Sequence, residues 1–209
     1  METAPLVPAN RIIGEIYSLE DTICAVYQSQ GKIESMTQDI THFKGRYLSL
    51  LERDGWEFAS RSNASGVVVI IPVTAAGEII LVEQYRKPVG TTVIELPAGL
   101  VGDHVDPDES ILSAAGRELE EETGFSAASL ELLMNCPSSA GMSDEIVSFV
   151  LASGLERVGP GGGDESEEIE VHVIPLQEVD GWLKRQQAEG KPMDPKIYAA
   201  LYWLNSKPE

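Results

Sequence analysis

Residues 109–125, ESILSAAGRELEEETGF, contain the acidic run Glu120-Glu121-Glu122 close to Glu118. In a helix, Glu118, Glu121 and Glu122 would gather their carboxylates on one face, about one turn apart. Like charges at this spacing repel by about 0.2–0.5 kcal/mol per pair. Divalent cations such as Mg²⁺ or Mn²⁺ reverse the effect, because hard cations prefer carboxylate oxygens and keep waters and substrate phosphates as further ligands. The segment therefore predicts a metal site, with a solvated acidic helix face as the alternative.

The surrounding residues favour a helix that packs on a core. A narrow apolar seam at helical spacing is formed by Ile111, Ala114, Ala115 and Leu119. Gly124 is the expected left-handed C-cap. Glu109 is expected to cap the positive N-terminal end, where a carboxylate is favoured. Arg117 is expected to orient the glutamates through charge-assisted hydrogen bonds.

Composition limits the classes of protein to consider. A chain of 209 residues with 43% hydrophobic residues is long enough for one sizeable core. The net charge of −19 argues against nucleic-acid binding, which needs clustered Lys and Arg. The N-terminus lacks a signal-peptide pattern, and no apolar run approaches about 18 residues, so membrane insertion and secretion are not expected. Cys24 and Cys136 do not form a disulfide framework, which favours the cytoplasm.

Patterning along the chain predicts an α/β protein. Residues 66–73 form a nearly continuous β-branched run, as expected of a central strand buried on both faces. The other predicted strands are residues 12–17, 22–27, 43–52, 56–60, 78–85, 92–96, 130–135, 145–152 and 169–174, and the closing helices are 176–188 and 194–206. This order favours an α/β/α sandwich around a mixed sheet, preceded by a small antiparallel sheet. We expect a β-rich subdomain at 1–62 and the main domain at 63–209.

The order Glu109, seven residues, then Arg117-Glu118-Leu119-x-Glu121-Glu122-x-Gly124-Phe125 resembles the Nudix box of the pyrophosphohydrolase family. Asp103 stands where the family has the opening Gly of the box. The equivalent glycine here is Gly99, which implies an insertion within residues 100–108. The resemblance implies a Nudix-type α/β/α sandwich with a mixed central sheet.

Two further motifs, Glu83-Gln84-Tyr85-Arg86 and Glu95-Leu96-Pro97-Ala98-Gly99, resemble the ADP-ribose pyrophosphatase branch of that family. The resemblance implies hydrolysis of the pyrophosphate of ADP-ribose to AMP and ribose 5-phosphate with Mg²⁺ or Mn²⁺. It assigns the metal to Glu118, Glu121, Glu122 and the carbonyl of Ala98.

The same resemblance implies substrate contacts outside the box. Arg86 offers a rigid fork of donors to a phosphate or ribose, with a salt bridge at the sheet end as the alternative. Trp56 matches an aromatic residue that stacks on adenine, with a core or dimer-interface role as the alternative. The N-terminal sheet implies a homodimer in which two chains build each site. The expected substrate-binding residues are Trp56, Glu57, Arg61, Arg86, Glu95, Gly99 and Gly141.

The resemblance also implies a water-activating base in a flexible loop after the box helix, and the acidic loop-to-strand junction at 165–173 matches that place here. Glu165 is the first candidate and Glu167 the second, with a merely solvated loop as the alternative. Three glycines, Gly161, Gly162 and Gly163, are expected to act as the hinge of that loop. The expected catalytic residues are Glu121, Glu165, Glu167 and Arg117.

Two other functions stay open at this stage. Ala140 stands where the branch usually has Pro, so another nucleoside-diphosphate sugar, of the ADP-glucose or GDP-mannose class, is the second candidate substrate. A non-catalytic ADP-ribose sensor is the third reading. Such sensors typically lose box acids and gain a DNA-binding module, whereas this chain keeps its acids and has no basic module.

Overall fold

A computed structural model of the protein describes residues 38–102, 108–163 and 168–206. The described residues from Thr41 onward belong to one compact unit. The strands are β1 (Ile40–Lys44), β2 (Leu48–Arg53), β3 (Trp56–Arg61), β4 (Gly66–Pro72), β5 (Glu78–Arg86), β6 (Thr91–Glu95), β7 (Ala98–Val101), β8 (Phe125–Pro137), β9 (Ile146–Arg157) and β10 (Ile169–Pro175). The helices are α2 (Ile111–Thr123), α3 (Val179–Ala188) and α4 (Lys196–Ser206).

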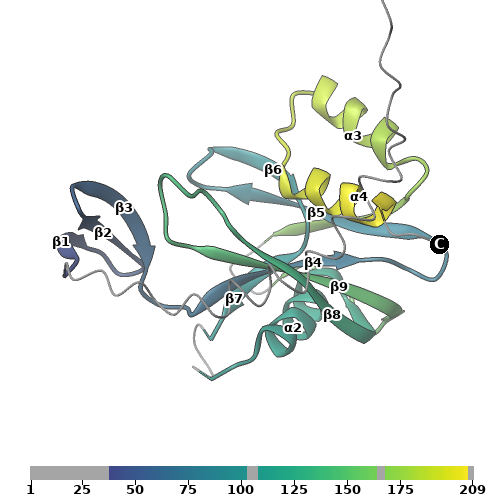
Figure 1. The fold of residues 1–209 in the computed structure, drawn as a ribbon. Helices are drawn as coiled ribbons and strands as arrows, with labels where there is room; N and C mark the ends of the chain where they lie inside the picture. Colours follow the sequence, from purple (N-terminus) through teal and green to yellow (C-terminus); the bar gives the residue numbers. More distant parts are fainter. Residues whose placement is uncertain (1–37, 103–107, 164–167, 207–209) are drawn as a thin grey trace, which may run out of the picture. The chain divides into compact units, whose positions relative to one another are not determined.

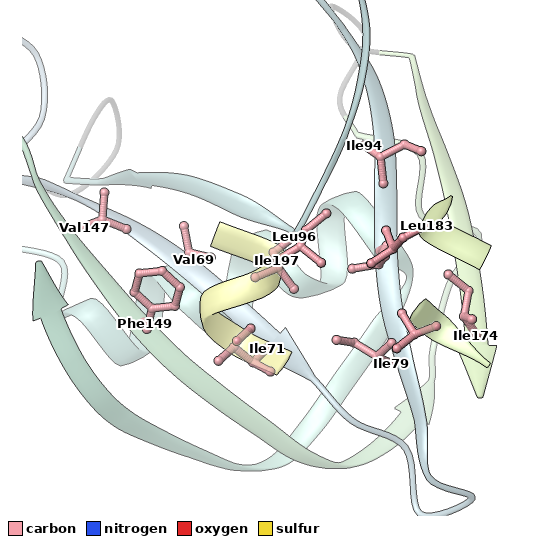
Figure 2. Close-up of a cluster of buried hydrophobic side chains, with 13 residues drawn as sticks. Val69, Ile71, Ile79, Ile94, Leu96, Val147, Phe149, Ile174, Leu183 and Ile197 are labelled. Carbon is pink, nitrogen blue, oxygen red and sulfur yellow. The ribbon is translucent and has the colours of Figure 1, made fainter. Parts of the chain in front are cut away.

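Strand β4 is the centre of the core, as its β-branched run predicts. Successive side chains of a strand point to opposite faces, so Val68 and Ile70 face one layer and Val69 and Ile71 the other. All four are fully buried. The first pair packs with α2, and the second packs with α3 and α4 in the cluster of Figure 2.

The strands around β4 form a mixed sheet in the order β7-β4-β9-β8, in which β4 is parallel to β9 and antiparallel to β7. A second, antiparallel sheet has the order β10-β5-β6. Helix α2 lies on one side of these strands, and α3 and α4 lie on the other (Figure 1). The predicted α/β/α sandwich with a mixed sheet is therefore confirmed.

The predicted N-terminal antiparallel sheet is confirmed as well, with the order β1-β2-β3. The prediction of one strand at 43–52 is wrong, because the chain turns after Lys44 and the N–H of Gly45 donates to the Leu48 carbonyl at 2.8 Å. Strands β8 and β9 are longer than predicted, since their polar outer ends still pair through the backbone. The strands expected at 12–17 and 22–27 lie outside the described residues.

A buried ion pair joins the connection between α3 and α4 to strand β5. Glu83 is 8% exposed, and its Oε2 accepts a hydrogen bond from Lys191 Nζ at 2.7 Å. His172 Nε2 lies 3.3 Å from the same oxygen. Burial alone raises the pKa of Glu83, but the hydrogen bond and charge of Lys191, with His172, bring that pKa below its ordinary value.

This pair predicts how stability depends on pH. The folded pKa of Glu83 lies below its ordinary value of 4.5, so the ionised carboxylate stabilises the fold above that pH, and the contribution is lost as pH falls through the lowered folded pKa. Glu83→Gln should cost about 1–3 kcal/mol near neutral pH. Urea unfolding across acidic pH should show this cost shrinking as Glu83 becomes protonated in the wild type. The control is Glu131→Gln, an equal charge change at an exposed position, and a pH-independent cost would contradict the prediction.

Candidate active site

The acidic helix α2 is built as its sequence predicts at the seam and at the C-terminal end. Ala114, Ala115 and Leu119 are fully buried, and Gly124 is a left-handed C-cap with φ of 73°. The N-terminal end differs from the prediction. Ser110 is the N-cap, and its side chain accepts from the N–H of Ser113 at 3.1 Å.

Glu109 therefore does not cap the helix, and that prediction is wrong. Its carboxylate accepts from Arg117 Nε at 3.0 Å, from Arg117 Nη2 at 3.1 Å, and from the N–H of Gly102 at 3.1 Å. The Arg117 hydrogen bonds, with the backbone N–H of Gly102, hold the pKa of Glu109 below its ordinary value despite partial burial. A serine hydroxyl one residue later satisfies the helix terminus and leaves Glu109 to bind Arg117.

Arg117 is the centre of an ion-pair network along α2. Besides Glu109, its Nη1 donates to Glu118 at 2.8 Å and to Glu121 at 3.2 Å, and its Nη2 donates to the Leu100 carbonyl at 3.1 Å. The Glu109 hydrogen bonds and the charge of Glu118 raise the pKa of Arg117 above its ordinary value. The guanidinium thereby offsets the repulsion between the carboxylates and fixes their directions.

Glu118 occupies the space that a side chain at residue 99 would fill. A Cβ built on Gly99 would lie 1.9 Å from Glu118 Cδ and 2.0 Å from Glu118 Oε1. Strand β7 thus approaches α2 so closely that only glycine leaves room for the carboxylate. Gly99, predicted to bind substrate, lines the cleft and positions Glu118.

Glu122 is the most buried of the three box glutamates, at 4% exposure. Its Oε2 accepts from the N–H of Ala98 at 3.0 Å. Glu121 is half exposed at the side chain. All three glutamates and Ala98 line one cleft between β7 and α2, and carboxylate and carbonyl oxygens are the ligands that Mg²⁺ and Mn²⁺ prefer.

These residues line a cleft of about 450 Å³. Its walls are Arg61, Val67, Arg86, Ala98, Gly99, Leu100, Arg117, Glu118, Glu121, Glu122 and Glu145. Three arginines lie on these walls, and each guanidinium is paired with a carboxylate. Arg61 donates twice to Glu145 Oε1, at 3.0 and 3.1 Å, and Arg86 pairs with Glu95 at 2.6 Å.

Arg86 therefore makes the salt bridge at the sheet end and also lines the cleft. Glu95 supports Arg86 and is absent from the cleft walls. Sequence reasoning missed Glu145, Val67 and Leu100 as cleft residues. Glu145 directly precedes β9, whose parallel pairing with β4 brings Val147 opposite Val67. Only that pairing reveals that Glu145 lines the same cleft as the glutamates of α2.

Trp56, Glu57 and Gly141 lie outside the cleft walls. Trp56 is 63% exposed, and its Nε1 donates to the Gly141 carbonyl at 3.2 Å, so Trp56 is not a core residue. Glu57 pairs across the strands with Glu52. In this chain β3 and the loop before β9 are joined by several contacts, including Ser60 Oγ to Asp144 at 2.9 Å.

Both candidates for the base, Glu165 and Glu167, lie outside the described residues. The glycines before them are described, and the hinge that they are expected to form stays a prediction. The N–H groups of Gly162 and Gly163 donate to the carbonyls of Glu122 and Glu121, at 2.8 and 3.0 Å. These glycines are fixed to the end of α2.

Fold and cleft together define an α/β/α protein with an acidic, arginine-containing site. Comparisons with known proteins agree. A model of the NUDIX domain matches residues 63–201. The chain is 39% identical over 143 residues to the ADP-ribose pyrophosphatase of Bacillus subtilis (strain 168), which covers 68% of this chain and 73% of that protein. The chain therefore belongs to the Nudix family of hydrolases.

Two more comparisons bear on the fold and the family. The chain is 35% identical over 140 residues to the methanol dehydrogenase activator of Bacillus methanolicus, across 66% of this chain and 71% of that protein. The crystal structure of an ADP compounds hydrolase matches with a TM-score of 0.61 at 23% identity, over 80% of this chain and 90% of that chain. This second likeness shows that the fold is shared. Among the described helices, none is both long and apolar enough to cross a membrane.

The close contact at Gly99 gives a testable prediction. Gly99→Ala should displace the Glu118 carboxylate and lower metal-dependent activity by about 10–100-fold, the usual effect of disturbing the support of a metal ligand. The melting temperature should change little, because the new methyl group meets the end of a flexible side chain. Gly66→Ala is the control, since nothing lies nearer than 4.0 Å to its new Cβ. Full activity of Gly99→Ala would show that activity does not depend on this position of the Glu118 carboxylate.

Proposed function

We propose that this protein hydrolyses the pyrophosphate bond of ADP-ribose to AMP and ribose 5-phosphate in a reaction that requires Mg²⁺ or Mn²⁺. The carrying observation is the convergence of Glu118, Glu121 and Glu122 with three arginines on one cleft. Similarity to the ADP-ribose pyrophosphatase of Bacillus subtilis supports the choice of substrate.

The charges of the cleft explain the need for metal. A dianionic pyrophosphate would meet several carboxylates, and their repulsion needs a cation to offset it. Oxygens of Glu118, Glu121, Glu122 and Ala98 are the proposed ligands. When bound there, the metal supplies charge neutralisation and acidifies the attacking water. Arg117 holds two of these carboxylates in place through its hydrogen bonds.

Arg61 and Arg86 are the proposed phosphate-binding residues. Both line the cleft, and each is paired with a glutamate, Arg61 with Glu145 and Arg86 with Glu95. A guanidinium has five N–H donors, so it can keep its carboxylate partner and still donate to a phosphate oxygen.

Adenine is proposed to stack on Trp56, with Glu57 and Gly141 beside it. The exposed ring is available for stacking, and its N–H bond to Gly141 fixes its orientation. Because these residues lie outside the cleft walls of their own chain, we propose a homodimer in which the N-terminal subdomain at 1–62 helps to complete the site of the partner through Trp56 and Glu57, while Arg61 lines the cleft of its own chain. Sedimentation that shows a monomer at assay concentrations, with full activity, would contradict this arrangement.

A substrate panel tests the proposal most directly. ADP-ribose, ADP-glucose, GDP-mannose, NADH, diadenosine polyphosphates and 8-oxo-dGTP should be assayed for product with and without metal. We expect the highest kcat/KM for ADP-ribose and no turnover without metal. Comparable turnover of a nucleoside triphosphate would overturn the assignment, as would no turnover of any pyrophosphate. A preference for another nucleoside-diphosphate sugar would change the proposed substrate but leave the proposed pyrophosphate hydrolysis unchanged.

The box glutamates give a second test. Glu118→Gln and Glu122→Gln each remove one negative charge with nearly the same shape, so the fold should persist. The metal-dependent rate should fall by more than about 100-fold, because even partners of metal ligands cost about 10–100-fold. Glu120→Gln is the matched control, since Glu120 lies on the same helix and is absent from the cleft walls. Parallel losses of melting temperature and activity would indicate a structural salt-bridge role instead.

Glu165 is proposed as the base that activates the water, with Glu167 as the second candidate. General-base assistance contributes about 100- to 10,000-fold, so Glu165→Gln should lower kcat by that factor and leave metal affinity unchanged. Steady-state kinetics with calorimetric metal titration separates the two effects. Loss of rate only in Glu167→Gln would move the base to Glu167. Full rate in both variants would indicate that a box glutamate activates the attacking water.

A further inference from the structure

Residues 158–163, here called the helix-end segment, cover the C-terminal end of α2. The last carbonyls of a helix lack partners within the helix. Here the carbonyls of Glu121 and Glu122 accept from Gly163 and Gly162, and the Gly124 carbonyl accepts from Val158 at 2.8 Å and Gly159 at 3.1 Å. A distant part of the chain thus completes the hydrogen bonding of the helix.

The helix-end segment lies so close to α2 that two positions exclude any side chain. A Cβ on Gly161 would lie 2.4 Å from the carbonyl carbon of Thr123 and 2.8 Å from the carbonyl oxygen of Glu122. A Cβ on Gly124 would lie 2.3 Å from the carbonyl oxygen of Gly159. Every one of these neighbours is backbone, so no side-chain rotation relieves the clash. A methyl group at Gly161 must move the segment or the end of the helix.

The two helix residues fixed in this way, Glu121 and Glu122, carry two of the cleft carboxylates. Glu122 is buried against the N–H of Ala98. Glu121 lines the cleft and also a second cavity of about 520 Å³, whose other wall contains Gly159, Pro160, Gly161 and Gly163. A shift of the helix end therefore moves both carboxylates relative to Ala98.

We propose that Gly161 is a positioning residue for the metal-binding carboxylates, acting through its contact with the backbone of Glu122 and Thr123. The inference rests on the proposed metal-dependent function of the cleft. It adds a residue outside the Nudix box on which metal binding depends. This residue lies in a segment whose glycines otherwise suggest flexibility. By linkage, metal bound to the carboxylates also stabilises the contact between the segment and the helix.

The first experiment compares three alanine variants by calorimetric titration with Mn²⁺ alone, well below each melting temperature. Gly161→Ala should weaken Mn²⁺ binding by about 10-fold or more, as expected when the support of metal ligands is disturbed. Gly159→Ala is the control within the segment, since nothing lies within 4 Å of its new Cβ. Gly77→Ala is the control for backbone strain, because its φ of 76° resembles the 69° of Gly161 but its surroundings are open.

Unchanged Mn²⁺ affinity in folded Gly161→Ala would overturn the inference, however far its melting temperature falls. An equal loss in Gly77→Ala would also overturn it, because strain alone would then explain the effect. If the wild type binds Mn²⁺ and hydrolyses ADP-ribose, either result leaves the proposed function intact. If the wild type binds no Mn²⁺, both the proposed function and the inference about Gly161 are contradicted.

A second measurement on the wild type covers the case in which Gly161→Ala does not fold. Amide exchange at Gly162 and Gly163 should slow on addition of Mg²⁺, by up to about 100-fold when Mg²⁺ exceeds its Kd by about 100-fold. The Gly77 amide, which donates to Thr74 in a remote turn, should exchange at an unchanged rate. Unchanged exchange at Gly162 and Gly163 with Mg²⁺ bound would show that the segment and the metal site are independent.

Discussion

The repulsion between carboxylates on one face of α2 is the constraint around which the site is built. Glu118, Glu121 and Glu122 are within a turn of one another, and this arrangement lowers helix stability unless cations oppose it. Arg117 supplies a permanent positive charge that contacts two of them and Glu109. One guanidinium cannot neutralise four carboxylates, so the site keeps a net negative charge that favours a divalent cation.

Packing holds the acidic helix in place against that repulsion. Its buried seam of Ala114, Ala115 and Leu119 lies on Val68 and Ile70 of β4, and small side chains allow the helix to approach the sheet closely. The same closeness recurs at Gly99, where β7 leaves room only for the Glu118 carboxylate. Backbone proximity thus acts together with the Arg117 hydrogen bonds to set the position of Glu118.

The substrate side of the cleft uses paired charges in the same way. Glu145 and Glu95 hold Arg61 and Arg86 on the cleft walls. In a protein with a net charge of −19, unsupported arginines would pair with whichever carboxylate is nearest, including those proposed to bind metal. These dedicated partners keep Arg61 and Arg86 away from Glu118, Glu121 and Glu122, as the proposed function requires.

The sequence by itself determined the central strand, the acidic helix with its seam and C-cap, and the clustering of Glu118 and Glu122, because these depend on local periodicity and on residue type. It did not determine that Ser110 caps the helix, that Glu145 faces the cleft, or that Gly161 is fixed against α2. Each of these depends on contacts between residues far apart in the chain. A glycine-rich run has the same local preferences whether or not it packs against another part of the fold, so only the tertiary structure shows this contact.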